Sequence, residues 1–405
     1  MTDSSALSGS VTDVQIAINQ VAGSGGGTAH VPEGSFGFMP ARIDPYNSQI
    51  LFGIDIPGGV NVVGDGLDKT ILYVPSDISS SYHFLSMFKP HGENSKPIRI
   101  SGISFKGITV AGSVTGDSAV VIDDCKDFRV DNCKFDTFGS GAVVVRNFKD
   151  YGNVVSQGVV DHCTFLDIYK SAVMNANYGY GYGVAVMKDY YIPTCPWETN
   201  PDNIFGNYNG NVFVEDCIFG GINGGRHDVM SFAGGCYVAR HNIHQNHSAE
   251  QCYDVHPARV NTYGGRCAEI YNNLINLPVP ITTKRVQGAI VQSGCGLFYN
   301  NQIAGCTDGI ILGNGEDNSA NVQISKLHGW YVWNNTFSSC WSNISTYGHE
   351  TIGGMPAPIE NTDYFLTQKT YTQYPYPHPL TMAFPHSLSI NSSPSKIPFT
   401  VKKLS

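Results

Sequence analysis

The stretch V-D-N-C-K-F at residues 130–135 recurs with small variations along this 405-residue chain. Its pattern is an aliphatic residue, two polar residues, Cys or Asn, any residue, and an aromatic or aliphatic residue. Further copies lie at 160–165, 214–219, 270–275, 298–303 and 332–337, with a degraded copy at 239–244 and an apolar copy at 100–105. Self-similarity at a loose period of about 30 residues indicates a repeat architecture.

The residues around each copy alternate between apolar and polar, which predicts β-strands. One such unit cannot bury its apolar face alone, so successive units must stack and share a core. Stacking places the fourth position of every copy in one column, with neighbours about 4.8 Å apart. We expect Asn there to bond to the next Asn and to supply the left-handed backbone of a sharp turn. Cys suits the same inward position because it is small and nearly apolar.

This pattern resembles the right-handed parallel β-helix of the pectate-lyase-like superfamily, whose asparagine ladder lies in the turn between the second and third strands. The resemblance covers roughly residues 11–350. It implies an all-β solenoid of about ten coils. The same architecture serves lyases, hydrolases, epimerases, phage tailspikes and adhesins, so it specifies the fold far more sharply than the chemistry.

Three parts of the chain are expected. Residues 1–24 form an N-terminal segment with a capping helix, in which Val14, Ile18 and Val21 share one face and Thr12 or Asp13 begins the helix. Residues 25–352 form the coils, interrupted by a long aromatic excursion at 178–210. Residues 353–405 form an extended, Pro-rich tail that lies along the last coils and shields the open end of the sheets, because Pro donates no hydrogen bond to a strand.

The 11 cysteines fall at regular positions in the repeat. Cys133, Cys163 and Cys217 occupy the ladder position. Cys236, Cys267 and Cys295 each lie six residues before a ladder Asn. These offsets predict buried, stacked thiols in the interior, and a disulfide between adjacent coils is the alternative.

The overall composition excludes some partners. The formal net charge of −9 argues against nucleic acid. No apolar run is long enough to span a membrane, and no signal peptide is apparent. From the resemblance we expect an extracellular or cell-surface protein whose partner is a polysaccharide.

Ionisable side chains gather in two stretches, 226–231 and 252–259. If Val255 points into the core, alternation points Asp254 and His256 outward on one face. By the same rule Asp228 and Met230 point outward from the preceding coil. Neighbouring coils lie about 4.8 Å apart, so Asp228, Asp254 and His256 are expected to form one cluster.

The predicted catalytic residues are His256, Asp254, Asp228 and Arg259. The predicted substrate-binding residues are Arg226, His227, Lys284 and Arg285 at the rim, with Tyr180, Tyr182 and Trp197 of the excursion stacking on sugar rings. The alternative for the excursion is a loop packed on its own aromatic residues.

Two reactions fit this cluster. A lyase acting on a uronate-containing polysaccharide needs a base for the C5 proton, which His256 or an Arg or Lys side chain would supply. It also needs a cation for the uronate carboxylate, either Arg259 or a Ca²⁺ ion held by Asp228 and Asp254. A hydrolase needs two carboxylates, for which Asp228 and Asp254 are available.

Other interpretations remain open at this point. The polygalacturonase motifs and the pectate-lyase motif Arg-x-Pro-x-x-Arg are missing, which weakens the enzyme prediction. A non-catalytic glycan-binding protein, an adhesin and a structural surface protein are the alternatives, with Asp and His as solvated surface groups. His241, His244 and His247 offer a further metal site. The leading prediction is a polysaccharide lyase.

Overall fold

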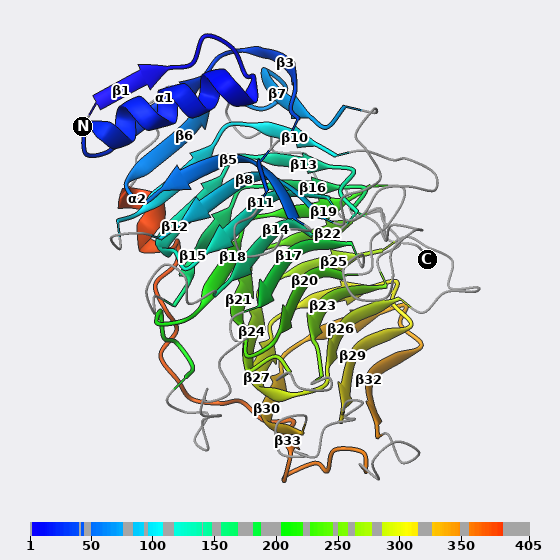
Figure 1. The fold of residues 1–405 in the computed structure, drawn as a ribbon. Coiled ribbons are helices and arrows are strands. Elements are labelled where there is room, and N and C mark those ends of the chain that lie inside the picture. The colour runs from blue at the N-terminus through cyan, green and yellow to red at the C-terminus, as the bar shows by residue number, and fades with distance from the viewer. Residues whose placement is uncertain are drawn as a thin grey trace.

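Three long sheets run the length of the molecule in the computed structural model (Figure 1). The structure describes residues 2–39, 42–43, 50–75, 84–92, 96–107, 117–139, 141–147, 155–168, 181–187, 204–221, 227–245, 250–257, 264–277, 286–314, 326–348 and 356–383.

Each sheet takes one strand from each successive coil. Sheet A contains, in order, β1 (Thr2–Ser5), β2 (Gly27–Val31), β6 (Val60–Gly64), β9 (Ile98–Ser101), β12 (Lys126–Asp131), β15 (Gln157–Asp161), β18 (Val212–Glu215), β21 (Cys236–Arg240), β24 (Cys267–Tyr271), β27 (Gly294–Tyr299), β30 (Leu327–Trp333) and β33 (Tyr364–Phe365). Sheet B contains β3 (Gly34–Gly37), β7 (Thr70–Tyr73), β10 (Ser104–Lys106), β13 (Lys134–Asp136), β16 (Thr164–Leu166), β19 (Ile218–Gly220), β22 (Ile243–Gln245), β25 (Leu274–Asn276), β28 (Gln302–Ala304) and β31 (Thr336–Ser338). Sheet C contains β4 (Arg42–Ile43), β5 (Ile50–Pro57), β8 (Phe84–His91), β11 (Asp117–Asp123), β14 (Gly141–Arg146), β17 (Tyr182–Met187), β20 (His227–Phe232), β23 (Gln251–Val255), β26 (Gln287–Val291), β29 (Asp308–Gly313) and β32 (Ser342–Tyr347).

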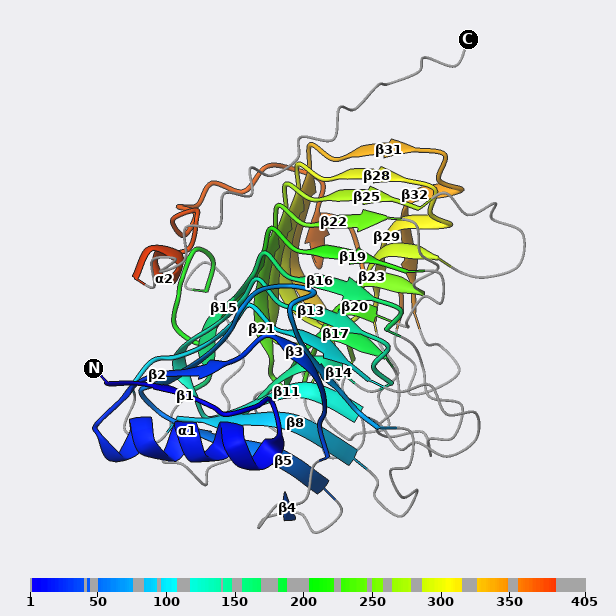
Figure 2. The ribbon, with the colours of Figure 1, turned by 90° about the horizontal axis from the view of Figure 1, so that it is seen from above.

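The strand pairing is parallel throughout the coils, and among the described residues only the β4–β5 pair is antiparallel. Sheet B has ten strands, one for each coil, which Figure 2 shows stacked from β3 to β31. The prediction of a right-handed parallel β-helix of about ten coils is confirmed. The first coil begins at β2, which pairs with β6.

The predicted ladder holds the coils together at the turn between sheets A and B. The backbone N–H of Cys217 donates to Asn242 Oδ1 at 3.0 Å, where the column changes from Cys to Asn. Asn242, Asn273 and Asn301 then each donate to the Oδ1 of the next Asn, ending at Asn335. The left-handed residue is the one before the ladder position, which corrects the expectation. Its φ lies between 50° and 59° at Asn132, His162, Asp216, His241, Asn272, Asn300 and Asn334.

An aromatic stack fills the interior beside sheet B. Phe105, Phe135, Phe165 and Phe219 lie face to face, with successive ring centroids 5.4, 5.0 and 4.7 Å apart. His244 continues this stack on the next coil, 4.8 Å from Phe219 and buried. The stack is therefore apolar up to His244, which introduces a polar ring into it.

A helix closes the N-terminal end of the coils (Figure 1). It is α1 (Val11–Gly23), and its buried residues include Val14, Ile18 and Val21 as predicted. The N-cap is Ser10, whose side chain accepts from the backbone N–H of Asp13, so the predicted caps Thr12 and Asp13 are wrong by two or three residues. No helix in the described part of the chain is long and apolar enough to cross a membrane.

The described part of the tail reaches much further than the last coils. It pairs β33 with β30, then runs back along the outer face of sheet A to the short helix α2 (Pro379–Ala383) beside β12 (Figure 1). Tyr371 bonds to Tyr299, Arg240 donates to the carbonyl of Tyr374, and Arg129 donates to the carbonyl of Thr381. We call residues 364–383 the strap.

All ten cysteines in the described residues are free thiols. Cys133, Cys163 and Cys217 are buried, as predicted. Cys236, Cys267 and Cys295 also lie in register, but they face outward in a second apolar cluster of sheet A. Alternation gives the interior position to the next residue, Tyr237 on β21, so the predicted interior placement of these three is wrong.

Candidate functional site

The outer face of sheet C carries a group of buried polar side chains on three adjacent strands. His227, Gln251 and Gln287 lie in register on β20, β23 and β26. Asp254, in the centre of β23, is paired with Met230 and Ile290. His227, Asp254 and Gln287 are buried, and only 1% of Asp254 is exposed. We call these four residues the outer site.

Among the described residues, most polar atoms of the outer site have no hydrogen-bond partner. His227 Nδ1 lies 3.0 Å from Asp254 Oδ2. This distance suits an ion pair, but the two atoms do not form a hydrogen bond. Both Asp254 oxygens and the Oε1 atoms of Gln251 and Gln287 are buried, and nothing in the described residues bonds to them. Folded proteins rarely leave such atoms unsatisfied, and a concentration of them is typical of a functional site.

His256 follows β23 and lies on the same outer face as Asp254, as alternation predicts. Its ring centroid is 6.5 Å from that of His227 and 5.5 Å from that of Phe232, edge to face. Its Nδ1 faces the carbonyl oxygen of Pro257 at 3.2 Å. His227, predicted only as a substrate-binding residue, is therefore the imidazole nearest to Asp254.

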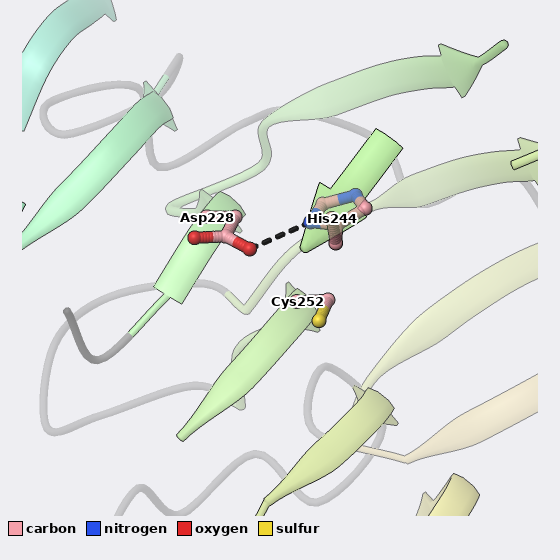
Figure 3. Close-up of side chains that lie close together, drawn as sticks. All are labelled: Asp228, His244 and Cys252. Atoms are coloured by element: carbon pink, nitrogen blue, oxygen red, sulfur yellow. Dashed lines mark hydrogen bonds and ion pairs between the residues drawn. The ribbon is translucent and has the colours of Figure 1, made fainter. Parts of the chain in front are cut away.

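Asp228 faces the interior, which contradicts the predicted cluster (Figure 3). Its Oδ2 accepts a hydrogen bond from His244 Nδ1 at 2.6 Å, and His244 belongs to the interior stack. Val229 also belongs to the interior core, so two successive residues point inward and strict alternation fails at this bend. Asp228 and Asp254 thus lie on opposite sides of sheet C. They cannot share a calcium ion or act as a carboxylate pair on one sugar.

Three further buried residues surround Asp228. His244 Nε2 lies 2.7 Å from the hydroxyl of Tyr253, and the thiol of Cys252 is close by (Figure 3). Burial raises the pKa of the Cys252 thiol well above its usual value, and it does the same for Tyr253. We call Asp228, His244, Cys252 and Tyr253 the inner cluster.

Two of the three histidines predicted as a metal site, His241 and His244, point to different sides of the coil wall. The ring of His241 stacks on Tyr376 of the strap, with centroids 3.9 Å apart, outside the coils. His244 lies inside them. His247 lies outside the described residues.

Several predicted site residues also lie outside the described residues: Arg226, Arg259, Lys284, Arg285, Tyr180 and Trp197. Tyr182 begins β17, and its ring centroid is 5.2 Å from that of His227. Residues 182–187 therefore form a regular sheet-C strand within the predicted excursion.

A second charged group on the same face was missed by the sequence analysis. Arg146 donates to both oxygens of Asp123 at 2.9 Å, and Lys89 Nζ lies 3.7 Å from Asp123. The signal was a Lys, an Asp and an Arg on three strands that each contain a run of apolar residues. Gln251 and Gln287 gave no such signal, because neutral amides are common on strands.

Comparisons with known proteins identify the fold. No protein-family model matches the sequence, and no curated protein sequence matches it. A mutant tailspike protein of E. coli bacteriophage HK620, in complex with a pentasaccharide, matches with a TM-score of 0.55 and 16% identity, over 85% of this chain and 54% of that one. Another tailspike mutant complex gives a TM-score of 0.56 and 17% identity over 85% and 54%. The A-module of a mannuronan C-5 epimerase from Azotobacter vinelandii gives 0.46 and 13% over 85% and 88%.

The fold is a right-handed parallel β-helix, as in the tailspikes. At these identities the likeness to the tailspikes concerns the path of the chain alone. The chain also spans only about half the length of the tailspike chains, 54% of the one compared first.

Proposed function

We propose that the protein is a polysaccharide lyase that binds an acidic, uronate-containing polysaccharide over the outer site of sheet C. The observation that carries this proposal is the buried His227–Asp254 pair with its unsatisfied polar atoms. The tailspike with the same fold holds a pentasaccharide, which supports a glycan as the ligand class. An extracellular or cell-surface location, where such polymers occur, is part of the proposal.

His227 is the proposed base. Its Nδ1 is buried against Asp254, which leaves Nε2 as the ring nitrogen to meet a substrate. In the proposed reaction Nε2 takes the proton from C5 of the uronate and the C–H electrons form the C4–C5 double bond. The C4–O bond breaks with its electron pair going to the oxygen, which takes a proton from water. The Asp254 carboxylate, 3.0 Å from Nδ1, would balance the positive charge that the ring gains when Nε2 takes the proton. His227 replaces His256 as the base because it is the imidazole closer to Asp254.

The uronate carboxylate must be neutralised for this reaction. Arg259 is the proposed cationic side chain, and Ca²⁺ is the proposed cofactor, with Asp254 and the substrate carboxylate as oxygen ligands. Activity should then fall after treatment with a calcium chelator and return with added Ca²⁺. Unchanged elimination in the chelator would remove calcium from the proposal and leave this role to Arg259.

A hydrolase is less well supported than a lyase, because Asp228 and Asp254 face opposite sides of the sheet. A non-catalytic glycan-binding protein is the main alternative, since Gln251 and Gln287 would bind sugar hydroxyls without any reaction.

A panel of uronate-containing polysaccharides separates these possibilities. We expect at least one polymer to yield products with the ultraviolet absorbance of unsaturated sugar ends. New reducing ends without that absorbance would indicate hydrolysis instead. Binding without either product would show that the outer site is a recognition surface.

A further inference from the structure

One inward position on the strands of sheet C is unusual in two adjacent coils. The preceding coils have Ala142 and Gly183 there, and the following coils have Gly288 and Gly309. The two coils between them have Asp228 and Cys252. At the same level, His244 takes the place of Phe in the aromatic stack. Three departures from the repeat, on β20, β22 and β23, therefore meet at one point inside the molecule.

The three side chains converge with their donor atoms close together (Figure 3). One ligand atom from each of Asp228, His244 and Cys252 lies within 4.8 Å of the others, and all three residues are buried. The other ring nitrogen of His244 is held by the Tyr253 hydroxyl at 2.7 Å. A metal-ligating His typically has its second nitrogen fixed by such an outer partner. Placing a carboxylate, an imidazole and a thiol in an apolar interior costs free energy unless they are paired or bind a metal.

We propose that Asp228, His244 and Cys252 bind one divalent transition-metal ion, with Zn²⁺ as the ion that best fits mixed O, N and S donors. Binding replaces the S–H bond of Cys252 by a sulfur–metal bond and releases that proton to solvent. The thiolate and the Asp228 carboxylate then balance the charge of the ion. Neutral His244 binds through Nδ1.

The proposed metal site lies directly beneath the outer site, because its residues are sequence neighbours of outer-site residues. Asp228 follows His227 directly in the chain, and Tyr253 precedes Asp254. An ion in the inner cluster ties β20, β22 and β23 together just beneath the outer site. The proposal of a metal site depends only on the inner cluster. It does not depend on whether the outer site is catalytic.

The test is metal uptake by the full-length protein, purified after expression with added Zn²⁺ and, separately, loaded with Co²⁺. We expect about one Zn²⁺ per chain by elemental analysis, and thiolate-to-cobalt charge-transfer absorption in the Co²⁺ form. His244→Phe should fold, because Phe occupies this position on the preceding coils, yet bind no metal. Cys252→Ala should likewise lose both signals, since Ala142 occupies the same column. Cys236→Ala, a buried thiol on the outer face of sheet A, should bind as the unchanged protein does.

Wild-type protein with no more metal than His244→Phe would overturn the proposal. Cobalt uptake without thiolate absorption would also overturn it. If His244→Phe does not fold, Cys252→Ala decides by the same two signals.

Discussion

At the level of single residues, the third and fourth positions of each repeat have different structural roles. The third position adopts the left-handed conformation, and short polar residues such as Asn300 tolerate it. The fourth position, such as Asn301, points inward and bonds to the coils on either side. The sequence predicted the ladder but combined both tasks at the fourth position, because Asn suits either one.

Asn301→Ala tests the ladder. The Asn301 amide donates to Ile270 O and Asn335 Oδ1 at 3.0 Å, and its Oδ1 accepts the backbone N–H of Asn273 at 3.1 Å. Replacement leaves buried backbone groups unsatisfied, so we expect the free energy of unfolding to fall by about 2–4 kcal/mol in urea titrations. Gln302→Ala, at the exposed neighbouring position, should change it by less than about 0.5 kcal/mol. Equal effects in both variants would contradict the role of the ladder.

Glu269 predicts a pH dependence of stability. Burial raises the pKa of this carboxyl from 4.5 to about 7, although the backbone N–H of Gly206 donates to it at 2.7 Å. The folded state therefore binds more protons at Glu269 than the unfolded state does between these values. The contribution of Glu269 to stability is greatest below about pH 4.5 and is lost as the pH rises to about 7. Glu269→Gln should remove this fall and be more stable than wild type at pH 8 by roughly 1–3 kcal/mol. Urea unfolding at pH 5 and pH 8 measures it, and an unchanged pH slope would count against this assignment.

At the level of elements, the strap was the part that the sequence located least well. Its Pro-rich composition predicts an extended tail, but its partners are single residues far away in the chain, such as Arg240 and Arg129. Contacts with single distant residues leave no periodic pattern in the sequence from which they could be predicted. The bend at Asp228 escaped prediction for a similar reason, since a local change in backbone direction overrides alternation without changing the residue pattern.

Arg240 connects the strap to sheet A. It is fully buried, pairs with Glu215, and donates to the carbonyls of Tyr374 and Pro375 at 2.7 Å. Arg240→Met leaves Glu215 buried without its cation, so we expect a loss of about 3–5 kcal/mol in unfolding free energy and faster proteolysis of the strap. The double variant Arg240→Met, Glu215→Leu should recover part of the loss. Additive effects of the two substitutions would show that the pair is not coupled.

At the level of the whole molecule, the repeat predicts the solenoid, its ten coils and the sheet that carries the outer site. Alternation also places Asp254 and His256 on one face. Alternation cannot predict which side chains of neighbouring coils meet. In the structure His227 lies against Asp254, whereas Asp228 lies on the other side of the sheet. Those contacts depend on the register between coils, which loops of unequal length determine.

The central claim is that the His227–Asp254 pair transfers a proton from a bound uronate. Its most direct measurement is the turnover of Asp254→Asn on whichever polysaccharide the protein cleaves, with binding and Tm measured on the same samples. Asn keeps the shape of the side chain and removes its charge. We expect turnover to fall by about 10²–10⁴-fold, a loss larger than any change in binding. Met230→Leu, in register with Asp254 on the neighbouring strand, should keep wild-type turnover. Wild-type turnover in Asp254→Asn would contradict the account.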